Sequence, residues 1–142
     1  MNRIDCATEQ ANEFRQRLQV RAHEFHADVD AASGSHDSAP GAHDYFDAAL
    51  AACKTLTATW YAKKHGIALE RVESHVERDD SEERSGRYKL KVRLAFHGPI
   101  TEEERGRLHA AVARCPVHKL MTTTEVIIET EPLPPSAGAS GG

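Results

Sequence analysis

The stretch FDAALAACKTLTATWYAKKHG, residues 46–66, predicts the long helix on which the fold depends. Its apolar residues recur at steps of three and four positions, which indicates a helix with one buried face. The residues of that face are Phe46, Ala49, Leu50, Cys53, Leu56, Thr57 and Trp60. Positive charge at residues 63–65 suits the C-terminal end of a helix, and Gly66 is typical of the residue after that end. We therefore expect a helix from just after Gly41 to near Gly66.

A second helix is predicted to begin after Thr101. Thr101 and Glu104 have the spacing of a capping box, in which each side chain accepts a hydrogen bond from the other residue's backbone. Leu108, Val112 and Cys115 follow at steps of four and three, so we place them on one face. Pro116 then ends or kinks the helix, because proline lacks a backbone N–H and its ring clashes with the preceding turn.

The strands show a different period. Residues 88–96 alternate between apolar and mostly charged side chains, which is typical of a strand with one buried face. Residues 72–76 form a weaker strand, and the polar stretch 79–86 between the two predicts an antiparallel hairpin. Residues 125–130 (EVIIET) predict a short final strand, and residues 18–29 predict one or two N-terminal strands.

This order of elements predicts an α+β fold with a largely antiparallel sheet. The chain has 142 residues, a length suited to one domain. We expect that domain to span residues 1–131. Residues 132–142 (PLPPSAGASGG) have no periodicity and the composition of a flexible linker, so we expect a flexible tail.

Charge and hydropathy exclude some classes of function. Eighteen Lys and Arg against 22 Asp and Glu give a net charge of −4, which argues against a general nucleic-acid binder. The longest uncharged apolar run, residues 48–52, is far too short to span a membrane. The first residues have no apolar leader of a secretory signal, so we expect a cytoplasmic protein with reduced cysteines.

Cys53 and Cys115 are the informative pair, because each lies on the apolar face of its own predicted helix. If those faces pack together, the two thiols can form a redox pair, in which one attacks a peroxide and the other condenses with the sulfenic acid to a disulfide. From their spacing alone, two small buried apolar residues are the more common case, because free cysteines are often buried. In a third alternative, Cys115 and His118 supply a zinc spacing. Cys6 has no partner that we can identify, and we assign it no role.

A reactive Cys53 needs a positive charge from outside its own helix. It lies about ten residues into the helix, well past the first turn in which the dipole acts. An arginine from a strand is the best source, because a guanidinium stays charged when it is buried. Arg21, on the predicted N-terminal strand, is the candidate.

The residues around both cysteines resemble those of one family. Residues 48–57 (AALAACKTLT), followed by YAKKHG at 61–66 and Leu69-Glu70, resemble the peroxidatic-cysteine helix of the OsmC/Ohr family. These are the osmotically inducible and organic hydroperoxide resistance proteins. Residues 114–119 (RCPVHK) resemble the family's second motif, which surrounds its resolving cysteine. Residues 39–46 (APGAHDYF) are similar to its helix-entry motif.

The resemblance implies curved antiparallel sheets around two central helices, and an intertwined homodimer with active sites at the subunit interface. It implies thiol-dependent reduction of hydroperoxides, organic ones in many members, as a defence against oxidative stress. By position, Cys53 is the peroxidatic and Cys115 the resolving cysteine. No cofactor, metal or prosthetic group is implied. The reductant is an external dithiol, such as a lipoylated protein or another small thiol.

Two positions depart from the hydroperoxide-resistance branch. His43 stands where that branch has a glutamate that holds the activating arginine, so we include His43 among the candidate catalytic residues. Lys54 replaces the small hydroxyl residue that commonly follows the cysteine. The chain therefore resembles the generic OsmC-like branch more closely. The alternative function is a small-molecule or lipid-binding protein that keeps the fold and has little or no peroxidase activity.

Overall fold

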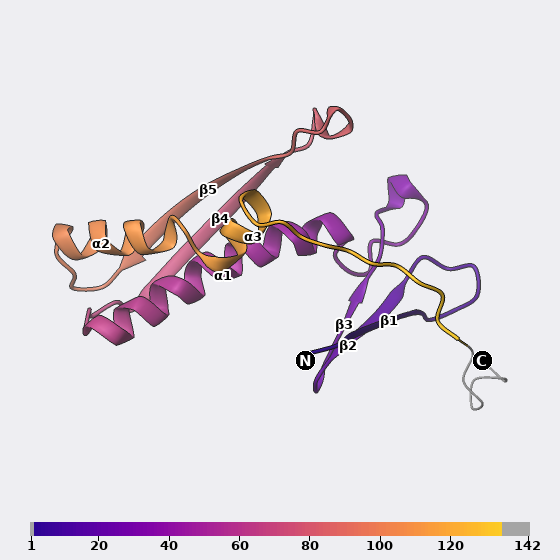
Figure 1. Ribbon diagram of the computed structural model, residues 1–142, viewed down its shortest axis with the longest axis horizontal. Helices are drawn as coiled ribbons and strands as arrows, with labels where there is room; N and C mark the ends of the chain where they lie inside the picture. Colours follow the sequence, from indigo (N-terminus) through magenta and orange to yellow (C-terminus); the bar gives the residue numbers. More distant parts are fainter. Residues whose placement is uncertain (1, 135–142) are drawn as a thin grey trace.

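The computed structural model describes residues 2–134 and contains three α-helices and two small antiparallel sheets (Figure 1). Its elements are β1 (Ile4–Thr8), β2 (Gln16–Val20), β3 (His23–Ala27), α1 (Ala42–His65), β4 (Arg71–Asp79), β5 (Lys89–His97), α2 (Glu102–Val112) and α3 (Pro116–Thr122). Short 3₁₀ turns, η1 (Ala31–Ser33) and η2 (Glu83–Ser85), lie in two of the loops. The predicted α+β class is confirmed.

The predicted first helix is confirmed as α1, and local interactions fix both of its ends. Asp44 Oδ2 accepts the backbone N–H of Gly41 at 2.8 Å, which satisfies a donor before the first turn. Gly66 has a left-handed φ of 66°, and its N–H donates to the Ala62 carbonyl. Glycine adopts this conformation without steric cost, so it ends the helix where the sequence predicts.

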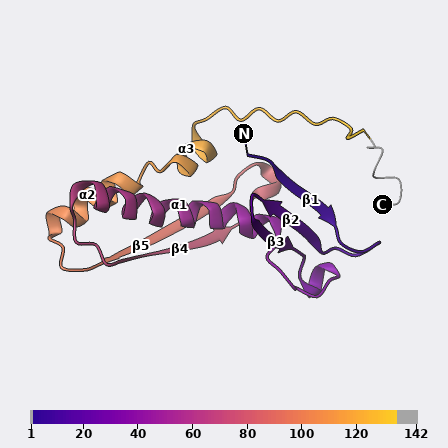
Figure 2. The same ribbon diagram turned by 90° about the horizontal axis from the view of Figure 1, so that it is seen from below.

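β4 and β5 form the predicted antiparallel hairpin, and α1 lies along it (Figure 2). The register pairs Val72 with Phe96 and Val76 with Val92, so the alternate apolar side chains share one face. α2 packs beside α1 and adds Leu108 and Val112 to the core. The capping box at its start is confirmed, because the Glu104 N–H donates to Thr101 Oγ1 at 3.0 Å. The buried core consists of Ala58, Ala62, Ile67, Phe96, Leu108 and Val112.

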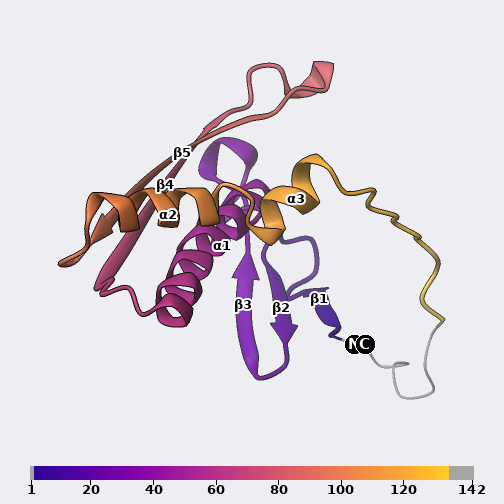
Figure 3. The ribbon, with the colours of Figure 1, turned by 60° about the vertical axis from the view of Figure 1, so that its left-hand side comes forward.

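The three strands β1–β3 form a separate sheet near the start of α1 (Figure 3). Tyr45 of α1 connects this sheet to the rest of the chain: its hydroxyl donates to the His26 carbonyl, and its ring packs edge-on against Phe25 at 5.5 Å. The two predicted N-terminal strands are β2 and β3. β1 was not predicted, because its five residues are all exposed and show no clear alternation.

The predicted final strand over residues 125–130 is wrong. These residues adopt neither helix nor strand, and the C-terminal segment (residues 125–134) leaves α3 as an extended chain (Figure 2). Ile127 and Ile128 are 75% and 82% exposed. A strand needs the hydrogen bonds of a neighbouring strand, and none of the described strands lies beside this segment. Most of the predicted flexible tail, residues 135–142, lies outside the described residues.

The predicted buried face of α1 is also largely wrong. The buried residues step by four positions and are Leu50, Lys54, Ala58 and Ala62, with Asp47 one turn earlier. Leu56 and Trp60, which we expected in the core, are 68% and 60% exposed. Apolar residues occupy both sides of α1, so their spacing fits two faces. The hairpin and α2 pack against the face with the alanines, because small side chains permit close approach of the helix.

Candidate functional site

Cys53 and Cys115 come together where α1 passes residues 113–115, the joint between α2 and α3. Cys53 is half-buried near the middle of α1, whereas Cys115, just before α3, is fully buried. Both are free thiols, and Cys53 lies near enough to Cys115 to influence its pKa. The structure thus brings together two of the four predicted catalytic residues, which are 62 positions apart in sequence.

The RCPVHK segment builds one side of this site. The prediction that Cys115 lies on the second helix is wrong, because α2 ends at Val112 and Cys115 is the residue before α3. Pro116 begins this third helix, which was not predicted, at the first helical position, where its missing N–H costs no hydrogen bond. The next residue, Val117, donates its backbone N–H to Cys53 Sγ at 3.4 Å. On the other side of that sulfur, Thr57 Oγ1 lies 3.9 Å away, one turn further along α1. The proline therefore sets the start of a helix whose first turn contacts Cys53.

The surroundings of Cys115 act on its thiol in both directions. Burial raises the pKa of the Cys115 thiol, and the neighbouring Cys53 raises it further. The backbone amide of His118 and the positive charge of Lys54 lower the pKa again. Burial outweighs these two groups, so the pKa of Cys115 is raised overall and its thiolate is disfavoured in the dry interior.

An open groove of about 610 Å³ lies beside Cys53. Leu56 and Trp60 of α1 form one wall and Val117 of α3 belongs to the other, so the lining is almost entirely apolar. An exposed apolar groove next to a half-buried thiol suits an apolar small molecule or a second protein surface.

His43 lies at the start of α1 and does not reach the thiols within one chain. Ten residues separate it from Cys53, which is about 15 Å of helix. Its Nε2 is 2.9 Å from Glu83 Oε2, and this carboxylate raises the pKa of His43. The role predicted for His43 stays a prediction.

Sequence reasoning missed a polar cluster beside His43. Arg78 of β4 binds Asp44 Oδ1 at 2.7 Å and Asp47 Oδ2 at 2.6 Å. Tyr88 donates its hydroxyl to Asp47 Oδ1 at 2.8 Å, and burial together with that carboxylate raises the pKa of Tyr88 to about 12. The hydrogen bond from Gly41 and then the one from Arg78 lower the pKa of Asp44. Two acids three residues apart at a helix start are the only signal of this cluster in the sequence.

Arg21 lies in the two-residue turn between β2 and β3 rather than on a strand, and it is exposed. Its φ of 51° is in the left-handed region, which such tight turns require. The sheet that carries it meets α1 at Tyr45, about 12 Å of helix before Cys53. Cys53 Sγ contacts Val117 and Thr57 instead. The activating role of Arg21 stays a prediction.

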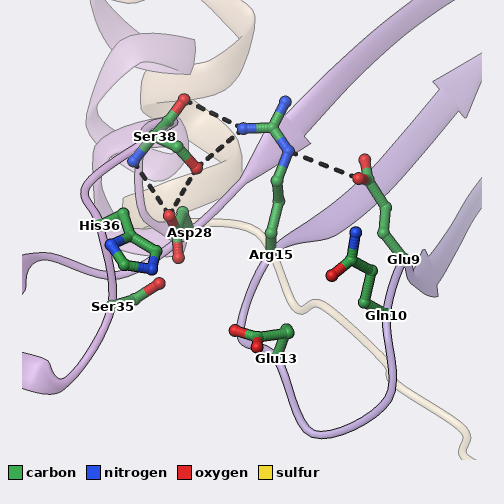
Figure 4. Close-up of a pocket in the computed structure, with 8 residues that line it drawn as sticks. All are labelled: Glu9, Gln10, Glu13, Arg15, Asp28, Ser35, His36 and Ser38. Carbon is green, nitrogen blue, oxygen red and sulfur yellow. Dashed lines mark hydrogen bonds and ion pairs between the residues drawn. The ribbon is translucent and has the colours of Figure 1, made fainter.

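A polar hollow of about 330 Å³ lies between the N-terminal sheet and the loop before α1 (Figure 4). Asp28, only 4% exposed, accepts the backbone N–H and the hydroxyl of Ser38 at 2.9 and 2.6 Å. Hydrogen bonds from Ser35 and Ser38 hold the pKa of Asp28 well below its usual range. Arg15 Nη1 donates to Ser38 Oγ at 2.8 Å. Asp28, Ser38 and Arg15 thus hydrogen-bond to one another, and these bonds stabilise the loop before α1.

The zinc alternative gains no support from the geometry. No group of three or more His, Cys, Asp or Glu side chains within residues 2–134 is arranged to hold a metal ion. His118 Nδ1 is 3.1 Å from Lys54 Nζ, so this nitrogen already has a partner. In the same part of the chain, no helix has the length and apolar character needed to cross a membrane.

The fold and the site define an α+β protein with a half-buried cysteine on α1 and a buried cysteine in the connection between α2 and α3. Residues 34–131 match the model of the OsmC family, described as OsmC-like protein. This match covers more than half of the chain, so the protein belongs to the OsmC-like family. The resemblance of its two cysteine motifs to that family is thereby confirmed.

Solved structures agree with this family. The chain is similar to an OsmC-like protein from Mycoplasma pneumoniae, with 18% identity over 87% of this chain and 88% of the other, at a TM-score of 0.69. It is similar to an organic hydroperoxide resistance protein OsmC from Legionella pneumophila, with 19% identity over 87% and 90% and a TM-score of 0.60. The corresponding values for OhrB of Bacillus subtilis are 19%, 87%, 91% and 0.58. Among curated proteins no sequence matches this chain.

Proposed function

We propose that this protein is a thiol peroxidase that reduces organic hydroperoxides, with Cys53 as the peroxidatic and Cys115 as the resolving cysteine. The observation that carries the proposal is the pairing itself: a half-buried thiol at an open apolar groove, backed by a fully buried second thiol. Membership of the OsmC-like family supports it, as do structural relatives that are named organic hydroperoxide resistance proteins.

The cycle uses the residues as follows. The Cys53 thiolate attacks the O–O bond of the hydroperoxide, the alkoxide takes a proton from solvent and leaves as the alcohol, and Cys53 becomes a sulfenic acid. The Cys115 thiolate then attacks that sulfur and releases water, with the proton supplied by solvent, and a Cys53–Cys115 disulfide forms. An external dithiol reduces the disulfide and is itself oxidised. No cofactor enters this cycle, and we expect it to operate in the reducing cytoplasm, where a lipoylated protein or a small dithiol is the reductant.

The proposal includes a homodimer that completes the active site. Large apolar side chains are exposed on α1, at Leu56 and Trp60, and in the C-terminal segment, at Ile127 and Ile128. Exposed apolar surface of this kind marks a contact with another protein. In a dimer the C-terminal segment would gain the neighbouring strand that it lacks in one chain. Arg21 is the source predicted from the sequence for the positive charge that Cys53 needs, and the dimer we propose would bring Arg21 of the partner subunit to this site, with His43 as a supporting residue.

The apolar groove also favours one alternative, a binding protein for small apolar molecules or lipids with little peroxidase activity. The two functions differ in what happens to the thiols. A binding protein retains apolar ligand through purification and leaves both cysteines reduced when peroxide is added.

The decisive experiment counts free thiols before and after one equivalent of cumene hydroperoxide. It uses the Cys6→Ser variant, because Cys6 is an exposed third thiol. We expect the loss of two thiols and a peptide in which Cys53 is linked to Cys115. Persistence of both thiols, or over-oxidation of Cys53 without the link, would contradict the proposal and favour the binding protein.

A further inference from the structure

Lys54 is a buried charge that the proposed cycle does not use. It follows Cys53 in α1, points to the closed side of the helix and is 4% exposed. An ammonium group removed from water destabilises the protein unless hydrogen bonds and opposing charge compensate it. A lysine in this position therefore needs a physical reason.

The partners of Lys54 lie around the joint that carries Cys115. Its Nζ donates to the carbonyl of Val112 at 2.6 Å, to that of Ala113 at 3.5 Å, and to His118 Nδ1 at 3.1 Å. Val112 is the last residue of α2, where carbonyl groups have no partner inside the helix and carry the negative end of its dipole. Three acceptors match the three donors of an ammonium group.

One of these acceptors also holds Cys115. The Val112 carbonyl accepts the backbone N–H of Cys115 at 3.3 Å as well as the Lys54 ammonium. The same lysine thus fixes the turn immediately before α3. An ammonium group can only donate, so His118 must accept at Nδ1, and a neutral ring then carries its proton on Nε2. Lys54 therefore sets both the backbone position of Cys115 and the tautomer of His118.

Besides burial, three groups act most strongly on the charge of Cys115. Cys53 and Lys54 face it from α1, and the backbone amide of His118 lies near it in α3. Lys54 is the one positive side chain among these groups. Burial disfavours the Cys115 thiolate, and among these groups Lys54 is the one whose full positive charge favours it.

We propose that Lys54 is a positioning residue for the resolving cysteine, which holds the α2–α3 joint and stabilises Cys115 as a thiolate when the disulfide forms and when it is reduced. This inference rests on the proposed peroxidase function. It also predicts which sulfur of the Cys53–Cys115 disulfide the reductant attacks and which one leaves. The reductant thiolate attacks the accessible sulfur of Cys53, a mixed disulfide forms there, and the electron pair of the broken S–S bond leaves on Cys115. A second thiolate of the dithiol then releases Cys53 and closes the reductant's own disulfide.

The physical reason for this direction is accessibility together with leaving-group stability. Cys115 is fully buried, so an external thiol reaches Cys53 more easily. Thiol–disulfide exchange is faster when the departing thiolate is more stable. The Lys54 ammonium gives that stability to Cys115, within the interior where a charge acts most strongly.

The test compares Lys54→Gln, which keeps hydrogen-bond donors without the charge, with Lys54→Met, which removes both. Lys63→Met is the matched control, because Lys63 is an exposed lysine on the same helix. The oxidised proteins, all with Cys6→Ser, are reduced with dithiothreitol in stopped flow. We expect the rate constant to fall by roughly tenfold in both Lys54 variants and to stay within about twofold in the control. An unchanged rate in Lys54→Gln would overturn the role of the charge.

A second measurement is independent of any peroxidase activity. In the Cys6→Ser/Cys53→Ser background, Cys115 is the remaining thiol, and its ionisation is followed by the ultraviolet absorbance of the thiolate. We expect the pKa of Cys115 to be higher with Lys54→Gln than with Lys54, and unchanged with Lys63→Met. If the pKa shifts while wild-type protein consumes no peroxide, the proposed function fails but the action of Lys54 on Cys115 stands. If the pKa does not move, the inference about Lys54 fails by itself.

Discussion

The two faces of α1 contrast in a way that reverses the usual pattern. The closed face, against the hairpin and α2, buries the charged residues Asp47 and Lys54. The open face exposes Leu56 and Trp60 beside Cys53. A surface helix of a monomeric globular protein usually exposes its charged residues and buries its large apolar residues. The exposed apolar side chains of the open face are the observation on which the proposed homodimer rests, and the two buried charges are each paired by hydrogen bonds within the chain.

The largest expected effect distinguishes the two cysteines, Cys53 at the open face of α1 and the buried Cys115 before α3. Cys53→Ser should abolish turnover of cumene hydroperoxide, because no other half-buried thiol lines the groove among the described residues. Cys115→Ser should permit the first attack but leave Cys53 to over-oxidise, because no resolving thiol remains. The measurement is peroxide consumption together with the mass of the oxidised protein. Undiminished turnover in Cys53→Ser would disprove the assignment.

The next effect concerns stability. Leu108 of α2 packs fully buried in the closed core, and Leu108→Ala should lower the free energy of unfolding by about 2–5 kcal/mol. Leu56→Ala on the open face should cost less than about 0.5 kcal/mol in the monomer. Urea unfolding of both variants at low protein concentration checks the difference.

The same pair also tests the dimer. If a second chain covers the open face, the cost of Leu56→Ala should grow with protein concentration, because association then stabilises the folded state. The cost of Leu108→Ala should not depend on concentration in this way. Equal costs for the two variants at low concentration would mean that α1 has no open face in solution.

The last effect is a pH dependence at the start of the closed face. The pKa of Tyr88 is raised to about 12, so its contribution to stability is complete below its unfolded pKa, near 10, and is lost as the pH rises through about 12. Tyr88→Phe should cost about 1 kcal/mol at pH 8, because the hydrogen bond to Asp47 is lost.

That cost should shrink as the pH rises from about 10 towards 12, since only the wild-type protein then loses the tyrosine's contribution. The check is the difference in urea midpoint between Tyr88→Phe and wild type across this range. A difference that is the same at every pH would show that Tyr88 ionises without cost in the folded protein.

Much of the fold could be predicted from the sequence because its signals are local. Gly41, Gly66, Thr101 and Glu104 fix helix ends through their own neighbours, and the predicted helix starts agree with the structure. The alternation of residues 88–96 likewise predicts β5 and its hairpin. These features depend on backbone geometry within a few residues, so no knowledge of the tertiary structure is needed.

The candidate site could be predicted only in part. The two cysteines stood out through the motifs around them, but the partners of His43 and Lys54 did not. Glu83 is 40 residues from His43, and the acceptors of Lys54 are 58 to 64 residues away. A single sequence contains no periodicity that links positions so far apart.

By itself the sequence determined the first two helices, the hairpin, the family and the two cysteines, because these follow from local spacing and short motifs. Only the tertiary structure decided which side of α1 is closed, that residues 125–130 lie unpaired, and that a lysine contacts the end of α2. The physical reason is the same in each case. Burial and hydrogen bonding are settled by what packs against a segment, and α1 offers apolar residues on both sides, so its sequence fits either choice.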